Sequence, residues 1–382
     1  MRDVFIVGIG QTAVGEHWDR GLRELGEAAI RDALADAGME RVDALYAGNM
    51  MGGCLNGQEN VATLLADAAG LLPLEAWKVE AACASGGAAV RAAALAVAAG
   101  AHEAVLAVGI EKMTDGVPDS VTASLATAAD QDYEASHGFS FVALSALLMR
   151  RYMHETGRER AAFAPFAVTA HKNAQTNPRA MFREPLSVED FSSCAMVASP
   201  IGILDAAPVC DGAAAVVVCA QSMLRPHHKP VRIAASAVAT DTIGLAERED
   251  ILTLGAAAHS AARAYKVAGR GPKDMDLFEA HDAFTIITAL SLEACGFARR
   301  GEALDLAAKG CVAPEGCIPL STMGGLKARG HPVGASGTYQ IVEAALQLRG
   351  EAGPNQIKGA RRALAQSIGG HGSVAVTHIL EV

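Results

Sequence analysis

The stretch Glu80-Ala81-Ala82-Cys83-Ala84-Ser85-Gly86-Gly87 and its counterpart Gly330-His331-Pro332-Val333-Gly334-Ala335-Ser336-Gly337 decide the fold of this 382-residue chain. Each is a turn of small residues that leads into an apolar segment predicted to be helical, one running to Gly100 and the other over 338–348. A thiol at a helix N-terminus lies near unpaired amides and the positive end of the helix dipole, so we expect the pKa of Cys83 to fall. A histidine on the matching turn could take the proton of that thiol. Together the turns predict a nucleophilic acyl-transfer site.

Each of these residues also has a purely structural interpretation. A single cysteine in an alanine-rich segment is usually a small buried hydrophobic side chain, and a histidine beside Gly-Pro is usually a turn residue. The combination favours chemistry, because the two turns share a design and a third histidine, His281, lies between them in the chain. A structural role for His281 would have it bonded to Glu279 or Asp282.

The composition excludes several classes of protein. With 51% hydrophobic and 19% charged residues, the chain can bury a large core and is long enough for two or three subdomains. A formal charge of -10 argues against nucleic-acid binding. The apolar stretch 81–101 contains Arg91 and several glycines, so we expect no membrane span. Eight scattered cysteines, of which only Cys311 and Cys317 lie close together, predict no metal site and a reducing, cytoplasmic setting.

The order of the predicted elements indicates an internal duplication. In each half, strands alternate with helices, which is typical of parallel-type sheets with helices on their faces. The helices that follow Cys83 and His331 are predicted to be counterparts. The predicted strands are 4–10, 44–48, 104–109, 231–239, 277–279 and 362–367, and the predicted helices outside the two turns are 22–38, 60–70, 254–268 and 285–296.

A more polar stretch separates the two halves. We expect residues 115–207 to form an inserted, mainly helical loop domain, with residues 1–114 and 208–228 as the N-terminal half and residues 229–382 as the C-terminal half. The chain returns to the core at Asp211-Gly212-Ala213-Ala214, which feeds an apolar run predicted to be a buried strand.

The motifs resemble those of the thiolase superfamily over the full length of the chain. They are the Cys-Ala-Ser-Gly turn, Gly109-Ile110-Glu111-Lys112-Met113, Asp211-Gly212-Ala213-Ala214, Glu279-Ala280-His281-Asp282-Ala283-Phe284 and the run from Gly324-Gly325 to Gly337, in thiolase order. The His-Asp-Ala-Phe motif is more similar to the sterol-carrier-type and archaeal branch. The resemblance implies an α/β fold of five layers, α-β-α-β-α, built from two duplicated halves with a loop domain over the active site, and coenzyme A thioesters as substrates with no tightly bound cofactor.

The resemblance also implies roles for individual residues. Cys83 would be the acylated nucleophile and His331 its base, and the main-chain amides of Cys83 and of the turn at Gly370 would bind the acyl oxygen. His281 would polarise the thioester carbonyl of the second substrate. These assignments give three catalytic side chains and one catalytic glycine.

One feature departs from the thiolase pattern. Most thiolases carry a second cysteine that moves the α-proton, and this chain has Ser367 and Ala283 at the two usual places. A serine hydroxyl is far less acidic than a thiol, so His281, His331, a water molecule or His371 would have to move that proton. Acylation of Cys83 should be intact, whereas the step at the α-carbon is open.

Contacts to coenzyme A are predicted in the insert and near the C-terminus. His137 precedes the long insert helix and would line the acyl and pantetheine channel, Ser367 would lie beside the same site, and Ala207 stands where thiolases often place a serine. Basic side chains of the insert would meet the phosphates. The candidates are Arg150, Arg151, Lys172, Arg179 and Arg183.

The leading hypothesis is a short-chain acyl-CoA:acetyl-CoA C-acyltransferase that interconverts acetoacetyl-CoA and acetyl-CoA. Two alternatives remain. The first is another cysteine-dependent enzyme, either a decarboxylating condensing enzyme of the ketoacyl synthase kind or a partner-dependent acyltransferase. The second is a non-catalytic scaffold that binds acyl-CoA or lipid. The resemblance further implies a homodimer or homotetramer and allows for a small OB-fold, zinc-bearing partner protein.

Overall fold

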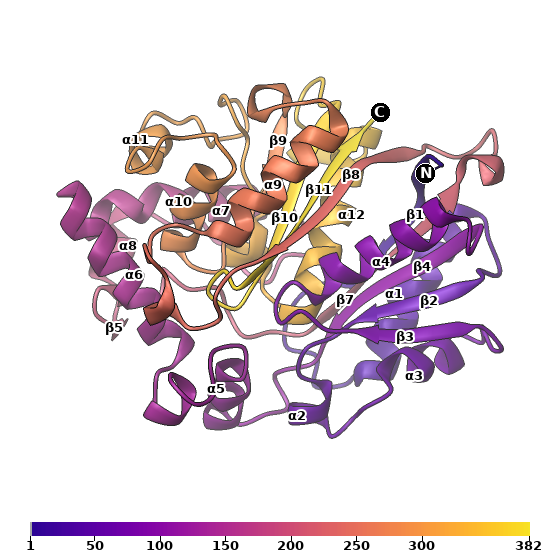
Figure 1. The fold of residues 1–382 in the computed structure, drawn as a ribbon, viewed down its shortest axis with the longest axis horizontal. Helices are drawn as coiled ribbons and strands as arrows, with labels where there is room; N and C mark the ends of the chain where they lie inside the picture. Colours follow the sequence, from indigo (N-terminus) through magenta and orange to yellow (C-terminus); the bar gives the residue numbers. More distant parts are fainter. Residues whose placement is uncertain (1) are drawn as a thin grey trace.

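Nine strands form one mixed sheet in the computed structural model, which describes residues 2–382 (Figure 1). The strand order is β3-β2-β4-β7-β1-β8-β11-β10-β9, and a separate pair, β5-β6, lies in the inserted segment. The strands are β1 (Val4–Gln11), β2 (Ala44–Gly48), β3 (Glu75–Val79), β4 (Ala104–Glu111), β5 (Met196–Ala198), β6 (Ile201–Gly202), β7 (Gly212–Ala220), β8 (Val231–Thr240), β9 (Leu277–Glu279), β10 (Arg362–Gly369) and β11 (Val374–Glu381).

The predicted duplication is confirmed by the pairing of the strands. β1 pairs antiparallel with β7, β7 antiparallel with β4, and β4 parallel with β2. The second half repeats this pattern, since β8 pairs antiparallel with β11, β11 antiparallel with β10, and β10 parallel with β9. The expectation of parallel-type sheets was therefore wrong for β7 and β11. A turn of only four residues joins β10 to β11, and so short a connection forces antiparallel pairing.

The helices complete the five layers. α4 and α12 lie between the two halves of the sheet and contact each other, α1 and α3 cover the outer face of the first half, and α9 covers β8 and β11 of the second half with α10 beside it (Figure 1). The longer helices are α1 (Leu22–Ala37), α3 (Val61–Ala68), α4 (Ser85–Ala99), α5 (Pro118–Ala126), α6 (Phe141–Thr156), α7 (Ala164–Ala174), α9 (Gly255–Ala268), α10 (Thr285–Ala294) and α12 (Ser336–Arg349); α2 (Gly52–Asn56), α8 (Val188–Ser193) and α11 (Ala303–Ala308) are short.

The central helices approach each other so closely that their contact requires glycine. A Cβ atom on Gly86 would lie 2.8 Å from the carbonyl oxygen of Gly334 and 2.7 Å from Oγ1 of Thr338. The small-residue turns of the sequence therefore allow the starts of α4 and α12 to meet. Residues 82–99 form the one helical segment in residues 2–382 that is long and apolar enough to cross a membrane, but α4 packs against β2, β4 and β7 inside the fold, which is the setting of a core helix.

The inserted segment is mainly helical, as predicted. It contains α5, α6, α7 and α8 with the small β5-β6 pair, and α6 and α7 pack on α10 of the C-terminal half (Figure 1). The residue boundaries of the three predicted regions stay a prediction. Cys311 and Cys317 form a disulfide that the sequence did not predict, and the other six cysteines are free.

Gly86→Ala should destabilise the fold, because the new methyl group would overlap the backbone of the turn before α12. Overpacking of this kind costs about 1–3 kcal/mol or more. The measurement is the midpoint of chemical denaturation. Gly271→Ala is the matched control, since the added Cβ would meet only Oδ2 of Asp274 at 3.9 Å. Equal midpoints for the two variants would contradict the close helix contact.

Candidate active site

Cys83 lies in the loop between β3 and α4, directly before the first turn of the helix. The preceding residue, Ala82, has a φ of 50°, a left-handed conformation that is uncommon for a residue with a side chain. This bend and the glycines that follow turn the chain sharply into α4. The Cys83 side chain is thereby placed at the end of the central layer, facing the C-terminal half.

His331 lies in the turn before α12, which corresponds to the Cys83 turn before α4. Gly330, with a φ of 117°, reverses the chain after the helical turn Gly325–Arg329. Nδ1 of His331 lies 2.7 Å from Oγ of Ser336, and that hydroxyl donates to the carbonyl oxygen of Pro332 at 3.2 Å. Because the serine proton is committed to Pro332, Ser336 accepts from Nδ1–H, and Nε2 is left unprotonated. His331 therefore has the tautomer of a general base.

His281 comes from the loop between β9 and α10. Its expected structural partners are occupied elsewhere, since Glu279 accepts from Thr322 and Asp282 accepts from the amide of Leu326. Nδ1 of His281 is buried and has no hydrogen-bond partner in the described chain. The bond to Glu279 or Asp282 that a structural role would require is therefore absent, and the His281 ring has an unused polar atom inside the fold.

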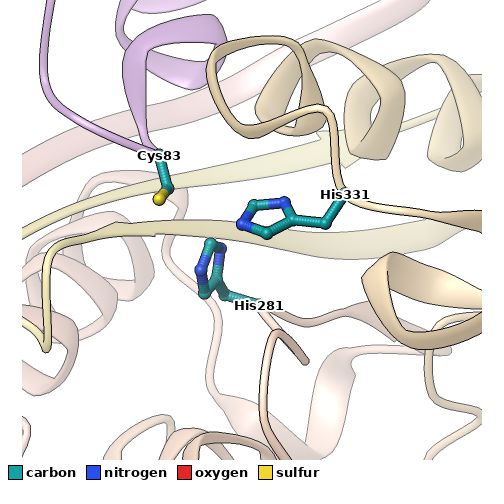
Figure 2. A group of neighbouring side chains, drawn as sticks. All are labelled: Cys83, His281 and His331. Carbon is teal, nitrogen blue, oxygen red and sulfur yellow. The ribbon is translucent and has the colours of Figure 1, made fainter. Parts of the chain in front are cut away.

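The three side chains converge from three separate segments (Figure 2). The Cys83 sulfur and one ring nitrogen of each histidine all lie within 4.8 Å of one another. The rings of His281 and His331 meet edge to face, with centroids 5.2 Å apart, and a ring nitrogen of His331 points toward Cys83 (Figure 2). One thiol and two imidazoles could also hold a soft metal ion, and the same proximity suits transfer of a proton from sulfur to nitrogen.

Burial keeps all three groups neutral. It raises the pKa of Cys83 to about 12, with the negative charge of Glu111 adding to the effect. Burial also lowers the pKa of His281 to about 3 and holds the pKa of His331 well below its usual value. The expectation that the helix terminus would lower the thiol pKa was wrong, because loss of hydration outweighs the amides near the sulfur.

The main-chain amides predicted as oxyanion donors lie near the nucleophile. Those of Cys83 and Gly370 lower the pKa of the Cys83 thiol against the larger effect of burial, and Gly370 lines the same cavity as Cys83. Gly370 lies in the turn between β10 and β11 and has a φ of 59°. Donors fixed by the backbone around a nucleophile can stabilise the oxyanion of an acyl intermediate without reorganising.

The three side chains line one cavity of about 460 Å³. Its other walls are largely apolar and come from the loop after β4, α5, the start of α6, the loop before β7 and the start of α10. They include Met113, Val121, Leu125, Phe141, Phe284 and Ile287. An apolar cavity with a few convergent polar groups is the usual form of a small-molecule site.

The predicted coenzyme A contacts lie outside this cavity. The predicted contact of Ser367 with the ligand is wrong. Its hydroxyl is buried, donates to Oε1 of Gln340 at 2.8 Å and packs against Gly87, and Ser367 does not line the cavity. Arg179 donates to the carbonyl oxygen of Gln11 in a different groove.

The remaining predicted contacts are at the surface of the insert. His137 and Lys172 are exposed, and Arg183 is exposed with its guanidinium donating to the carbonyl oxygen of Gln175. None of the three lines the cavity. Their contact with the distant end of coenzyme A stays a prediction.

Sequence reasoning missed residues that support the site. Glu111, quoted only as part of a motif, is fully buried and accepts from the amides of Met50, Met51 and Gly334, so that it joins the His331 turn to β4. Ser336, five residues after His331, was likewise given no role. Ser336 could have been noticed from its position in the small-residue turn after His331, and Glu111 from its position as a charged residue at the end of a predicted apolar strand.

His371 also lines the cavity. Its Nε2–H donates to the carbonyl oxygen of Phe141 at 3.0 Å, which leaves Nδ1 unprotonated, and its ring is tilted by 31° against the Phe141 ring with centroids 4.1 Å apart.

A duplicated α/β fold with a cysteine and two histidines at its centre defines a thiol-dependent acyl-transfer architecture, and comparisons with known proteins specify the family. Residues 4–222 match the thiolase N-terminal domain, and residues 237–382 match the thiolase C-terminal domain-like family. The chain belongs to the thiolase family, as its motifs predicted.

Its relatives include the archaeal branch that the motifs favoured. The chain is 45% identical to an acetyl-CoA acetyltransferase of Methanothermobacter thermautotrophicus, over 99% of both chains. It is 39% identical to one of Methanocaldococcus jannaschii, over 100% of this chain and 99% of the relative. Human sterol carrier protein 2 is 30% identical over 99% of this chain and 72% of its own length.

Solved structures agree on the fold. A structure described as an Ltp2-ChsH2(DUF35) aldolase superposes with a TM-score of 0.87 at 26% identity, covering 100% of this chain and 98% of that one. Human mitochondrial 3-ketoacyl-CoA thiolase in complex with CoA gives a TM-score of 0.78 at 20% identity, covering 100% and 98%.

The raised thiol pKa predicts the reactivity of the free protein. Alkylation of Cys83 by iodoacetamide should be slow at neutral pH and should rise about tenfold for each pH unit, without a plateau between about pH 7 and pH 10, because the thiolate stays a small fraction below its pKa. The measurement is mass spectrometry of the Cys83 peptide in a Cys54→Ser background, which removes the exposed thiol. A plateau below about pH 8 would instead indicate a preformed thiolate–imidazolium pair.

Proposed function

We propose that this protein is an acyl-CoA:acetyl-CoA C-acyltransferase that interconverts acetoacetyl-CoA and two acetyl-CoA molecules through an acyl-Cys83 intermediate. The observation that carries the proposal is the convergence of Cys83, His331 and the amides of Cys83 and Gly370 at one end of an apolar cavity. The acetyl-CoA acetyltransferases to which the chain is similar support acetyl-CoA as the substrate.

Acylation follows from the neutral resting state. As the thiol attacks the thioester carbonyl, Nε2 of His331 takes its proton, so no buried thiolate has to exist beforehand. The amides of Cys83 and Gly370 stabilise the oxyanion. The imidazolium then gives its proton to the departing coenzyme A thiolate, which leaves acyl-Cys83, free coenzyme A and a neutral His331.

The second step needs a base for the α-proton, and the cavity contains few candidates. Cys83 is blocked by its acyl group, Ala283 cannot titrate, and His371 does not belong to the cluster of Cys83, His281 and His331. In our proposal, neutral His331 takes the α-proton of acetyl-CoA, and His281 donates an N–H to the enolate oxygen. The enolate attacks the acyl carbonyl, the C–S bond to Cys83 breaks, and His331 returns the proton to the sulfur.

Assembly and location also belong to the proposal. β3 is an edge strand with a free side, and Leu72 before it is 46% exposed, which supports a homodimer or homotetramer. The similar structure described as an Ltp2-ChsH2(DUF35) aldolase supports a partner protein of the DUF35 kind. Six of the eight cysteines are free, which supports a cytoplasmic location, whereas the Cys311–Cys317 disulfide counts against it. Size-exclusion chromatography with light scattering tests the oligomer.

The direct test mixes the protein with acetoacetyl-CoA, with and without free coenzyme A. Intact-mass analysis should find acetyl-Cys83, and the enolate absorbance should fall only when coenzyme A is present. Cys83→Ala should lose both signals. Acetylation without cleavage would point to decarboxylative or partner-dependent chemistry, and no acylation would leave the binding-scaffold hypothesis.

The two histidines should fail at different steps. His281→Ala should still form acetyl-Cys83 from acetyl-CoA but should lose condensation and thiolysis by about 10²–10³-fold, as expected for removing an oxyanion donor. His331→Ala should lose acylation as well. Rapid-quench measurement of acetyl-Cys83 beside steady-state thiolysis separates the steps. Equal loss of acylation in both variants would contradict the division of roles.

A further inference from the structure

The cavity that contains Cys83 reaches solvent along one rim. Cys83, His281 and His331 are buried at its inner end, whereas its exposed lining residues come from the loop after β1, from α5 and from the loop before β7. We define the rim by these exposed residues. They are Glu16, Trp18, Pro118, Thr122 and Val209.

Trp18 is the largest side chain of the rim, and it does not pack into the hydrophobic core. Its exposed fraction is 68%, and it is one of only two tryptophans in a chain with 4% aromatic residues. An indole left in water at the mouth of a cavity is a surface suited to binding an apolar or flat group.

One side of the indole nevertheless has a partner in the fold. The ammonium group of Lys112 lies 5.7 Å from the centre of the Trp18 ring, within cation–π range. Lys112 is almost fully buried and is bound by Asp211 at 2.8 Å and by Asp115 at 2.6 Å. The cation behind the ring is therefore anchored to the core.

The loop that bears Trp18 is fastened to the same aspartate. The amide of His17 donates to Oδ2 of Asp211 at 3.0 Å, and Gly15 and Asp211 exchange two backbone hydrogen bonds of 3.2 and 2.8 Å. A side chain positioned in this way before a ligand arrives loses little conformational freedom on binding.

We propose that Trp18 is a substrate-binding residue that contacts the pantetheine arm of the coenzyme A thioester. The inference rests on the proposed function: with the thioester at Cys83, a molecule too large for about 460 Å³ must leave through the rim. The methylene and amide groups of the arm match the faces of Trp18, Pro118 and Val209. The carboxylate of Glu16 disfavours the phosphates at this point, so they lie farther out.

Fluorescence tests the contact without turnover. Trp77 lies on β3 and does not line the cavity, so Trp77→Phe leaves Trp18 as the only tryptophan. Coenzyme A and pantetheine should each change its emission saturably, whereas adenosine 3′,5′-bisphosphate should not. Trp18→Phe, which keeps Trp77, should show no change. A silent Trp18 while calorimetry detects coenzyme A binding, or a response to the nucleotide alone, would overturn the proposal.

Kinetics separates this role from a structural one. Trp18→Ala should raise KM for acetyl-CoA roughly tenfold with little change in kcat, since an aromatic contact contributes about one tenfold step in affinity. S-acetyl-N-acetylcysteamine, which carries only the inner end of the arm, should acetylate Cys83 equally fast in both proteins. Equal losses with both substrates, or no loss with either, would overturn the contact. If wild-type Cys83 is never acetylated, the proposed function fails, while the fluorescence still decides the role of Trp18.

Discussion

The contact between the starts of α4 and α12 is the constraint on which the rest of the site depends. Gly86 lies so close to the turn at Gly334 that a methyl group would collide with the backbone. Because the helices meet there, the two turns that precede them face each other across the middle of the molecule. Cys83 and His331 are thereby brought together from opposite halves of the duplicated fold.

This geometry has an electrostatic consequence. The end of the central layer is buried, and loss of hydration outweighs the helix terminus and the amides around Cys83, so the thiol and both imidazoles rest uncharged. Charge is created only as the thiol attacks, when the fixed amides of Cys83 and Gly370 can stabilise it. The site thus favours a coupled proton transfer over a stored thiolate.

The cavity also limits how the chemistry can proceed without a second cysteine. At its inner end Cys83, His281 and His331 form one cluster, whereas Ser367 donates to Gln340 in the core and His371 lies outside that cluster with its Nε2 bonded to Phe141. One base, His331, then serves both half-reactions in turn. In our proposal the exposed rim has a different role, which is to bind the pantetheine arm of the substrate outside the inner end of the cavity.

The sequence by itself determined the family, the duplicated α/β fold, the helical insert and the three central side chains. Those features are carried by local patterns: small-residue turns before apolar helices, alternating strands and helices, and motifs in a fixed order. It did not give the antiparallel course of β7, since that depends on the distant strands β1 and β4 beside it, and it did not predict β11 as a strand. It also misjudged the Cys83 pKa and the place of Ser367. The loss of hydration around Cys83, the meeting of Cys83 with His331 and His281, and the position of Trp18 at the cavity rim arise between segments up to hundreds of residues apart, so only the tertiary structure decides them.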